Sequence, residues 1–487
     1  MSGTSEPRSG TSEPHHDSAK TIESATIQPI PDSERHGTNR DLFTIWFGSN
    51  IMVLSIVTGG LSTTLFGQPL WTAVLGVVAG NLIGAVFMAL HSAQGPTLGI
   101  PQMVQTRGQF GSYGSVLIIL VVIVMYIGWF VANLVFGGQS LATITPISTK
   151  GGITIIAVAS LIATIYGYRL IHAYTRIMTY LSGAMLALAF VWVLFVHPLP
   201  HDFFGTGGAT LAGFMGTVSA AAVWQIAYAP YVSDYSRYMP AGTGAKPAFW
   251  MSYWGSTIGS ILPMLLGASV GLALPGADVI AGLTKLTGVF AVPIVVVFTV
   301  GIAATNAMNL YCSTLSTITV AQTFAPRWSA RARERAVVAA VLCGIALAIA
   351  LLGEKGFLAS YNNFIVLLLS ALVPWTAVNL VDYYLVRHGD YVVEDFFKAD
   401  GGRYGRINWP AVLCYLVGAA VQVPFLVTTI YTGPLGAKLG GVDISWCVGL
   451  VVASPVYYLV MKRYQARKSA VEDPPAFDTD VELAALD

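Results

Sequence analysis

Twelve long apolar runs constrain this chain of 487 residues more than any other feature of its sequence. An α-helix needs roughly 20 mainly apolar residues to cross the ~30 Å hydrocarbon core of a bilayer. Backbone groups inside that core must be bonded within the protein, so we expect each run to form a helix. The runs lie at about 42–66, 69–91, 114–143, 152–172, 178–196, 211–232, 248–274, 288–322, 334–352, 360–386, 408–431 and 443–461.

The basic residues indicate the direction in which the chain crosses the membrane. All but four of the 25 Lys and Arg residues fall in the tails, in alternate loops or at the helix ends facing these; the exceptions are Lys150, Lys285, Lys355 and Lys438. Because basic segments stay in the cytoplasm during insertion, we expect both termini there and a multi-pass protein of the plasma membrane. Tryptophans near the span ends are expected to mark the membrane interfaces; they are Trp46, Trp71, Trp409 and Trp446.

The overall composition excludes several other classes of protein. Charged residues make up 10% of the chain and hydrophobic residues 55%, which excludes an ordinary soluble domain. The net charge of +1 comes with cations spread along one rim, so no nucleic-acid partner is expected. The four cysteines lie in apolar runs without ligand spacing, so we expect neither a metal site nor a disulfide.

Polar sequence flanks the apolar region. Residues 1–40 are rich in Ser, Thr, Glu, Pro and His without an apolar period, and residues 463–487 form a second polar segment. We expect both segments to be cytoplasmic tails, the first of them disordered. Residues 41–462 then form one domain of twelve helices.

Two of the predicted spans contain residues that weaken a helix. The first span carries Ser-Ile-Val-Thr-Gly-Gly at 55–60, near mid-depth. The sixth span carries Pro230, which removes a helical hydrogen bond and disfavours helix at Ala229. We expect a break at each place, with a packing kink that serves no ligand as the alternative.

The two interrupted spans each begin a set of five. This arrangement is typical of secondary transporters built from two inverted repeats, in which broken helices 1 and 6 form a site at the bilayer midplane. The sequence therefore predicts an all-α polytopic membrane protein. Repeat 1 covers about 42–196, repeat 2 about 211–386, and two peripheral helices about 408–461.

Aromatic and carboxamide side chains near mid-depth indicate the kind of solute. Trp129 and Asn133 lie one turn apart on the third span, as do Trp224 and Tyr228 on the sixth, so each pair shares a helix face. Carboxamides match the edge of a flat heterocycle, and aromatic rings can stack on its faces. Bridging between helices is the alternative role for these amides. The candidate substrate-binding residues are Ser55, Trp129, Asn133, Trp224, Gln225, Tyr228, Asn306 and Asn309.

No charged residue lies in the middle of a predicted span. An unpaired charge is costly in a membrane, so the solute is expected to be neutral. A membrane-embedded enzyme would need a nucleophile with a base or a metal cluster, and the spans offer neither. Asp234, Arg237 and Asp382 lie at cytoplasmic helix ends, where we expect them to pair as an inner gate closes; solvated surface positions are the alternative.

Four segments resemble one transporter family. They are GPTLGIPQMVQTRGQFG at 95–111, YAPYVSDYSRYMP at 228–240, NAMNLYCSTLS at 306–316 and VPWTAVNLVDYYLVRHGDY at 373–391. They are similar to segments of the purine–cytosine permease branch of the nucleobase:cation symporter-1 family, and the resemblance extends over all twelve spans. It implies a leucine-transporter-type fold with ten core helices and two peripheral ones. It also implies cation-driven uptake of nucleobases or related ring compounds.

The resemblance further implies roles for individual residues. In this family a third-span Trp stacks on the substrate and a polar residue one turn later bonds to it, which matches Trp129 and Asn133. An eighth-span Asn of the family matches Asn309. Many relatives have a stacking Trp six residues before the Asp of the D-Y-S-R-Y segment, where this chain has Tyr228. Either Tyr228 or Trp224 could therefore supply that ring.

The coupling cation is expected to be H⁺ or Na⁺, with no other cofactor. Sodium-coupled relatives hold Na⁺ between first-span carbonyls and eighth-span hydroxyls. The matching eighth-span positions are Ala303 and Ala304, unless a shift of one residue brings in Thr305, so H⁺ is slightly favoured. The candidate cation-coupling residues are Ser55, Thr58 and Thr305.

The sequence thus predicts a monomeric symporter in the lipid bilayer that imports a neutral nucleobase of the cytosine or purine class by alternating access. Related substrates are the alternative: allantoin, hydantoin, uracil, or a thiamine or pyridoxine precursor. A passive channel is less favoured, because the midplane cluster is isolated rather than part of a continuous polar stripe. The short loops leave no signalling domain for a receptor.

Overall fold

The computed structural model describes residues 27–166, 168–205, 207–328 and 330–472. These residues form helices and no β-strand, with one isolated antiparallel bridge between Val427 and Thr432. The α-helices are α1 (Asn39–Asn50), α2 (Val53–Thr64), α3 (Leu70–Ser92), α4 (Gly95–Leu98), α5 (Gln102–Phe110), α6 (Gly114–Ile144), α7 (Thr149–Tyr166), α8 (Tyr168–Val191), α9 (Leu211–Ile226), α10 (Ala229–Ser236), α11 (Ala245–Ala273), α12 (Val279–Thr287), α13 (Ala291–Phe324), α14 (Ala332–Gly353), α15 (Phe357–Val381), α16 (Trp409–Ala420), α17 (Pro434–Lys438) and α18 (Ser445–Glu472).

Within the described ranges, nine helical segments are long and apolar enough to cross a membrane. The bent pair α1 and α2 makes a tenth if it counts as one span. Two shorter apolar helices, Thr149–Ile165 and Trp409–Phe425, occupy the places of the predicted fourth and eleventh spans. An all-helical membrane protein is therefore present, and nine or ten of the twelve predicted spans meet the length criterion.

The break in the first span lies earlier than predicted. α1 ends at Asn50 and α2 begins at Val53, with a bend of 58° between them, whereas Gly59 and Gly60 lie inside α2. These glycines serve close packing instead: a Cβ on Gly59 would come within 2.0 Å of the carbonyl oxygen of Met264 in α11. Glycine therefore lets α2 approach α11 without interrupting the helix.

Hydroxyl groups satisfy the carbonyls that the first break releases. The Ser55 hydroxyl donates to the carbonyl oxygen of Asn50. The Thr305 hydroxyl, from α13, donates to the carbonyl oxygen of Ser49 at 3.0 Å. Because an unbonded carbonyl is costly at membrane depth, these contacts fix where the helix can end.

The predicted break in the sixth span is present. α9 ends at Ile226 and α10 begins at Ala229, so Ala227 and Tyr228 separate two helical segments. Pro230 lies in the first turn of α10. Backbone N–H groups in a first turn have no acceptor within the helix, so a proline there breaks no helical hydrogen bond. The expectation that Ala229 is non-helical is wrong, because the proline starts a new helix rather than ending the old one.

The described part of the predicted N-terminal tail is packed against the helices. The prediction of disorder extended to residue 40, whereas Ile27 and Ile30 are buried, and Arg35 donates to the carbonyl oxygen of Pro96 at 2.9 Å. At the other end, residues 463–472 continue α18. Residues 1–26 and 473–487 of the two predicted tails lie outside the described ranges.

Two of the four tryptophans expected at the membrane interface are buried. Trp46 is 0% exposed and packs edge to face on Tyr228. Trp446 is 4% exposed, and its indole N–H donates to the Ser219 hydroxyl. Trp71 and Trp409 are 49% and 60% exposed, as expected for residues that face lipid or an interface. A position near a span end therefore does not tell whether a tryptophan is buried among the helices or lies at the membrane interface.

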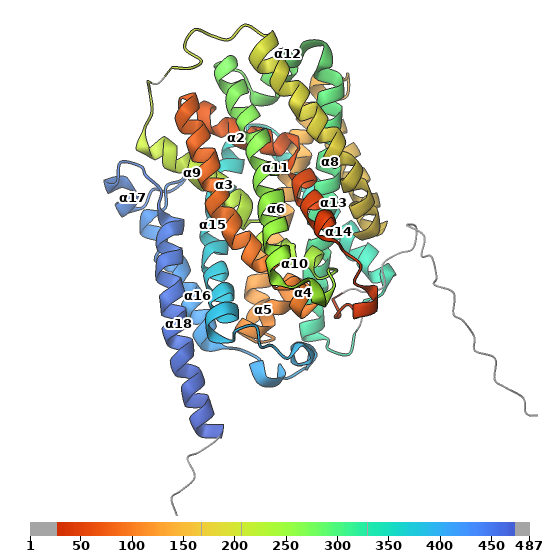
Figure 1. Cartoon of the computed structure of the whole chain (residues 1–487), viewed down its shortest axis with the longest axis vertical. Helices are drawn as coiled ribbons and strands as arrows, with labels where there is room; N and C mark the ends of the chain where they lie inside the picture. The colour runs from red at the N-terminus through yellow and green to blue at the C-terminus, as the bar shows by residue number, and fades with distance from the viewer. Residues whose placement is uncertain (1–26, 167, 206, 329, 473–487) are drawn as a thin grey trace, which may run out of the picture.

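The packing of the long helices brings the two breaks together. α3 packs along α9, α11 packs along both α1 and α2, and α13 packs along α6. In Figure 1, α12 lies at the upper end, α17 lies at the left at about the height of the α3 label, and α4, α5 and the last turns of α18 lie in the lower half. Both ends of the described chain lie in this lower half (Figure 1).

Candidate functional site

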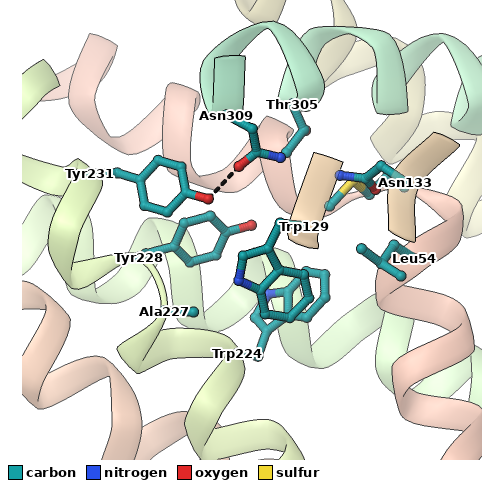
Figure 2. A pocket seen from close by; sticks show the side chains of 10 residues that line it. Leu54, Trp129, Asn133, Trp224, Ala227, Tyr228, Tyr231, Thr305 and Asn309 are labelled. Atoms are coloured by element: carbon teal, nitrogen blue, oxygen red, sulfur yellow. Dashed lines mark hydrogen bonds between the residues drawn. The ribbon is translucent and has the colours of Figure 1, made fainter. Parts of the chain in front are cut away.

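The two helix breaks face a small buried pocket (Figure 2). Its free volume is about 20 Å³, room for roughly one water molecule, so a ring fits only after the lining groups shift. The pocket lies between the first break, α6, the second break and α13. Its lining residues are Met52, Leu54, Trp129, Asn133, Trp224, Ala227, Tyr228, Tyr231, Thr305 and Asn309.

Trp129 is the centre of an aromatic wall. Its ring centroid lies 5.4 Å from Trp224, 5.4 Å from Phe364 and 6.0 Å from Tyr361, each in an edge-to-face arrangement. Nearly perpendicular rings leave no parallel slot, so a flat ligand must replace one of these contacts to stack on an indole face. Trp224 is held in place because its indole N–H donates to Asn50 Oδ1 at 2.7 Å.

Both candidates for the sixth-span aromatic residue lie against the pocket. Trp224 is in the last turn of α9 and Tyr228 is in the break that follows, with their ring centroids 6.2 Å apart. Tyr228 also packs on Trp46 at 5.2 Å and on Tyr231 at 5.7 Å. The break thus presents two aromatic groups to one cavity.

Two polar atoms of α6 are buried here without a partner among the described residues. They are Oδ1 of Asn133 and Nε1 of Trp129. Buried polar atoms in folded proteins nearly always have a hydrogen-bond partner, and those that lack one mark sites for a ligand or water. Because Asn133 and Trp129 also line the pocket, their free acceptor and donor are available to a bound molecule.

The eighth-span amides form a hydrogen-bonded pair. Asn309 lines the pocket, its Oδ1 accepts from the Tyr231 hydroxyl, and its Nδ2 donates to Asn306 Oδ1 at 3.3 Å. Asn306 does not line the pocket; its Nδ2 donates to the carbonyl oxygen of Phe130 at 3.2 Å. Of the two, only Asn309 is placed to contact a ligand.

Two further predicted binding residues, Ser55 and Gln225, do not line the pocket either. The Ser55 hydroxyl is bonded to the backbone at the first break. Gln225 donates to Asn81 Oδ1 at 2.8 Å and accepts from the Ser256 hydroxyl at 2.6 Å. Because Gln225 follows Trp224 directly, it points about 100° away around the helix, toward α3 and α11. Its amide joins helices, which was the alternative considered for such side chains.

The three predicted cation-coupling hydroxyls do not converge. Thr305 lines the pocket and bonds to Ser49, whereas Ser55 bonds to Asn50 and Thr58 contacts the Tyr361 hydroxyl at 2.7 Å. A hard cation needs several oxygen ligands around one point. Within the described ranges there is also no group of three or more His, Cys, Asp or Glu that could hold a metal.

The predicted gate residues are buried rather than solvated. Asp234 is 2% and Arg237 0% exposed, and Asp234 Oδ1 accepts from the backbone N–H of Gln102 at the start of α5. Asp382 is 0% exposed and pairs with Arg387 Nε at 3.0 Å. The alternative of simple surface solvation is therefore wrong for all three.

Sequence reasoning missed several residues of the site. Tyr231 could have been found, because it follows Tyr228 by three residues and so faces the same way on α10. Asn50, which holds Trp224, stood out only as a polar residue near a span end. Met52 and Leu54 are ordinary apolar residues, and nothing in the sequence separates them from the rest of the first span.

Comparisons with known proteins relate the helical region to transporters. The model of a family described as permeases for cytosine/purines, uracil, thiamine and allantoin matches residues 29–449. A candidate purine-cytosine permease of Bacillus subtilis, YxlA, is 38% identical over 455 residues, 93% of this chain and 98% of the relative. The purine-cytosine permease fcyB of Emericella nidulans is 25% identical over 472 residues, 92% of this chain and 89% of the relative.

The fold is similar to that of a solved transporter. Mhp1, a nucleobase-cation-symport-1 family transporter in a closed conformation with bromovinylhydantoin bound, matches with a TM-score of 0.72. The match covers 93% of this chain and 97% of that chain at 20% sequence identity. At this identity the likeness concerns the fold alone, and it confirms the transporter fold class.

The two buried amides should respond in opposite ways to an apolar replacement. Gln225→Leu takes away the donor to Asn81 Oδ1 and the acceptor of the Ser256 hydroxyl, so we expect the free energy of unfolding to fall by about 2 kcal/mol or more. Asn133→Leu removes a buried oxygen for which the described part of the chain offers no partner, so stability should be unchanged or higher. Thermal unfolding of the purified proteins in one detergent measures both, and a loss of stability in Asn133→Leu equal to that in Gln225→Leu would contradict the assignment.

Proposed function

Since this chain belongs to the family of permeases for cytosine and purines, uracil, thiamine and allantoin, we propose that it imports a neutral nucleobase of the cytosine or purine class by symport with a cation. It is a multi-pass membrane transporter and not an enzyme. The observation that carries the choice of solute is the pocket at the two breaks, where indole faces meet a buried carboxamide oxygen that has no partner among the described residues. A neutral flat ring with a polar edge complements these groups.

We propose the complete architecture as twelve spans in two inverted repeats of five, followed by two peripheral helices, acting as a monomer. Support comes from the positions of the breaks: the α1–α2 bend and the α9–α10 break each begin one set of five. The shorter helices Thr149–Ile165 and Trp409–Phe425 complete the twelve. In such transporters, alternating access moves one group of helices against the other around a fixed site.

We propose H⁺ rather than Na⁺ as the coupling ion. The Thr305 hydroxyl is bonded directly to the Ser49 carbonyl at the first break, and the preceding α13 positions, Ala303 and Ala304, offer no side-chain oxygen. A sodium ion at this place would have to displace that hydrogen bond and would find few oxygen ligands in return.

Uptake into a host that lacks its own nucleobase transporters tests the function directly. We expect accumulation of at least one of cytosine, adenine, hypoxanthine or guanine, supplied as radiolabelled rings beside uracil and allantoin. Accumulation of uracil or allantoin alone would favour the alternative substrates. A protonophore should abolish accumulation, and replacement of external Na⁺ by choline should leave it unchanged. A passive channel would equilibrate the ring without accumulation under every condition, and sodium dependence would contradict H⁺ coupling.

Variants of the pocket test the binding residues. Trp129→Ala removes the central indole and Asn133→Ala the free carboxamide, so each should weaken apparent affinity by about tenfold or more. Asn309→Asp should be worse, because it places a carboxylate beside a neutral ring. The KM for uptake is measured at matched membrane levels, with Gln68→Ala, outside the pocket, as the control. A normal KM in Trp129→Ala and Asn133→Ala would move the site elsewhere.

We propose that both termini are cytoplasmic and that the protein lies in the plasma membrane. Four exposed basic residues test this orientation. Lys150→Cys and Lys438→Cys should react with an impermeant thiol reagent in intact cells, and Arg331→Cys and Arg403→Cys only after permeabilisation. The unmodified chain gives the background from its native cysteines, and the reverse labelling would contradict the orientation.

We propose that Asp234, Arg237 and Asp382 contribute to an inner gate. Asp234 holds the start of α5 through Gln102 N–H at 2.8 Å, so this contact joins the end of α10 to a different element. Asp234→Asn weakens it, and we expect the maximal uptake rate to change by about threefold or more while KM is kept. Asp32→Asn, at a position on the surface, is the matched control. Normal turnover at a normal membrane level would contradict a gating role.

A further inference from the structure

We propose that Tyr231 is a positioning residue for substrate selection: its hydroxyl orients the Asn309 amide so that Asn309 keeps an N–H donor for the bound ring. The proposal rests on the function proposed above, because it concerns the same pocket. Figure 2 shows its hydroxyl directed at the Asn309 oxygen, with Asn309 facing the cavity.

A chain of three hydrogen bonds runs from Tyr231 to the backbone of α6. Tyr231 donates to Asn309, Asn309 donates to Asn306 at 3.3 Å, and Asn306 donates to the carbonyl oxygen of Phe130 at 3.2 Å. We call these four residues the amide relay. Phe130 directly follows Trp129, so the relay links the second helix break, α13 and the helix that carries the central indole.

The last member fixes the direction of every bond in the amide relay. A backbone carbonyl can only accept, so Asn306 must turn Nδ2 toward Phe130 and Oδ1 toward Asn309. Asn309 must then turn Nδ2 toward Asn306, which leaves Oδ1 facing Tyr231. The Tyr231 hydroxyl is therefore the donor. The donor and acceptor chemistry of these groups alone therefore fixes the orientation of both amides.

Burial makes this orientation strict. Asn306 is 0% exposed, and Asn309 and Tyr231 are each 2% exposed. Reversing the Asn309 amide would set its oxygen against Asn306 Oδ1 and would take away the acceptor of the Tyr231 hydroxyl proton. Two buried mismatches of this kind are expensive in a low-dielectric interior. Tyr231 and Asn306 thus hold Asn309 from opposite sides.

The fixed amide determines what the ring must offer. One N–H of Asn309 is used by Asn306, so the second N–H is the donor that remains. Asn133 supplies an unpaired acceptor from α6. The matching substrate class is a flat neutral ring that carries an acceptor for Asn309 and a donor for Asn133 on its edge. A ring whose acceptor nitrogen is replaced by C–H should therefore be rejected.

A double-mutant cycle on uptake tests the proposal. The probe is the ring from the panel above that the unaltered protein accumulates best, compared with its deaza analogues, each of which lacks one ring-nitrogen acceptor. The unaltered protein should disfavour one analogue by about tenfold, and Tyr231→Phe should reduce that preference to about threefold or less. When Tyr231→Phe is added to the Asn309→Ala variant, the preference of that variant between the ring and its analogue should not change further, because Tyr231 acts through Asn309.

Tyr126→Phe is the matched control. Tyr126 packs edge to face on Tyr231 at 4.5 Å, and its buried hydroxyl donates to the carbonyl oxygen of Pro230 at 2.8 Å, outside the amide relay. Its loss removes a comparable hydrogen bond without freeing Asn309, so the preference between ring and analogue should stay as in the unaltered protein. An unchanged preference in Tyr231→Phe, or an equal change in Tyr126→Phe, would overturn the proposal.

A second measurement keeps the proposal separate from the transport assignment. Thermal unfolding of purified Tyr231→Phe, Asn309→Ala and the double variant should be non-additive, because both single changes break the same hydrogen bond. Additive losses would overturn the amide relay whatever the protein transports. Non-additive losses in a protein that accumulates no ring of the panel would support the relay and contradict the proposed function.

Discussion

Every backbone carbonyl inside a bilayer must find a donor, and this requirement governs how the first span can be broken. At the break, Ile51 and Met52, hydroxyls reach two of the carbonyls that the end of α1 leaves free, one from Ser55 five residues along the chain and one from Thr305 on α13. The pocket lies beside this break. α1 and α2 meet at 58° where side chains satisfy the backbone, and Met52 and Leu54 beside this bend line the pocket.

Asn50 joins that break to the aromatic wall. Its Nδ2 donates to the carbonyl oxygen of Trp46 at 2.5 Å, and its Oδ1 accepts from Trp224 and from the Ser260 hydroxyl. One side chain therefore holds the end of α1, the last turn of α9 and α11 together. A satisfied buried network of this kind is rigid, since a group that moved alone would break hydrogen bonds that no water replaces. The indole of Trp224 is consequently placed by the first span as much as by its own.

The fold and part of the site could be predicted from the sequence, and the reasons differ from residue to residue. Trp129 and Asn133 were found because one turn of spacing puts both on one face. Gln225 was wrongly assigned to the pocket because it follows Trp224 directly and so points about 100° away around the helix. Hydropathy does not show which way a side chain points. Gly59 was taken for a break although it serves close packing, a distinction that only the position of Met264 makes visible. Short helices such as Thr149–Ile165 show that the length of an apolar run does not by itself fix the number of membrane spans.

The packed segment before α1 sets a boundary for shortening the chain. Ile30 N–H donates to the carbonyl oxygen of Gly99, Arg35 donates to that of Pro96, and Gly37 N–H donates to that of Tyr238. A truncation that ends before Ile27 keeps all three donors, whereas one that begins the protein at Thr38 removes them together. An affinity tag or fluorescent fusion therefore belongs upstream of Ile27, where it leaves the connection between the start of α1 and the end of α10 intact.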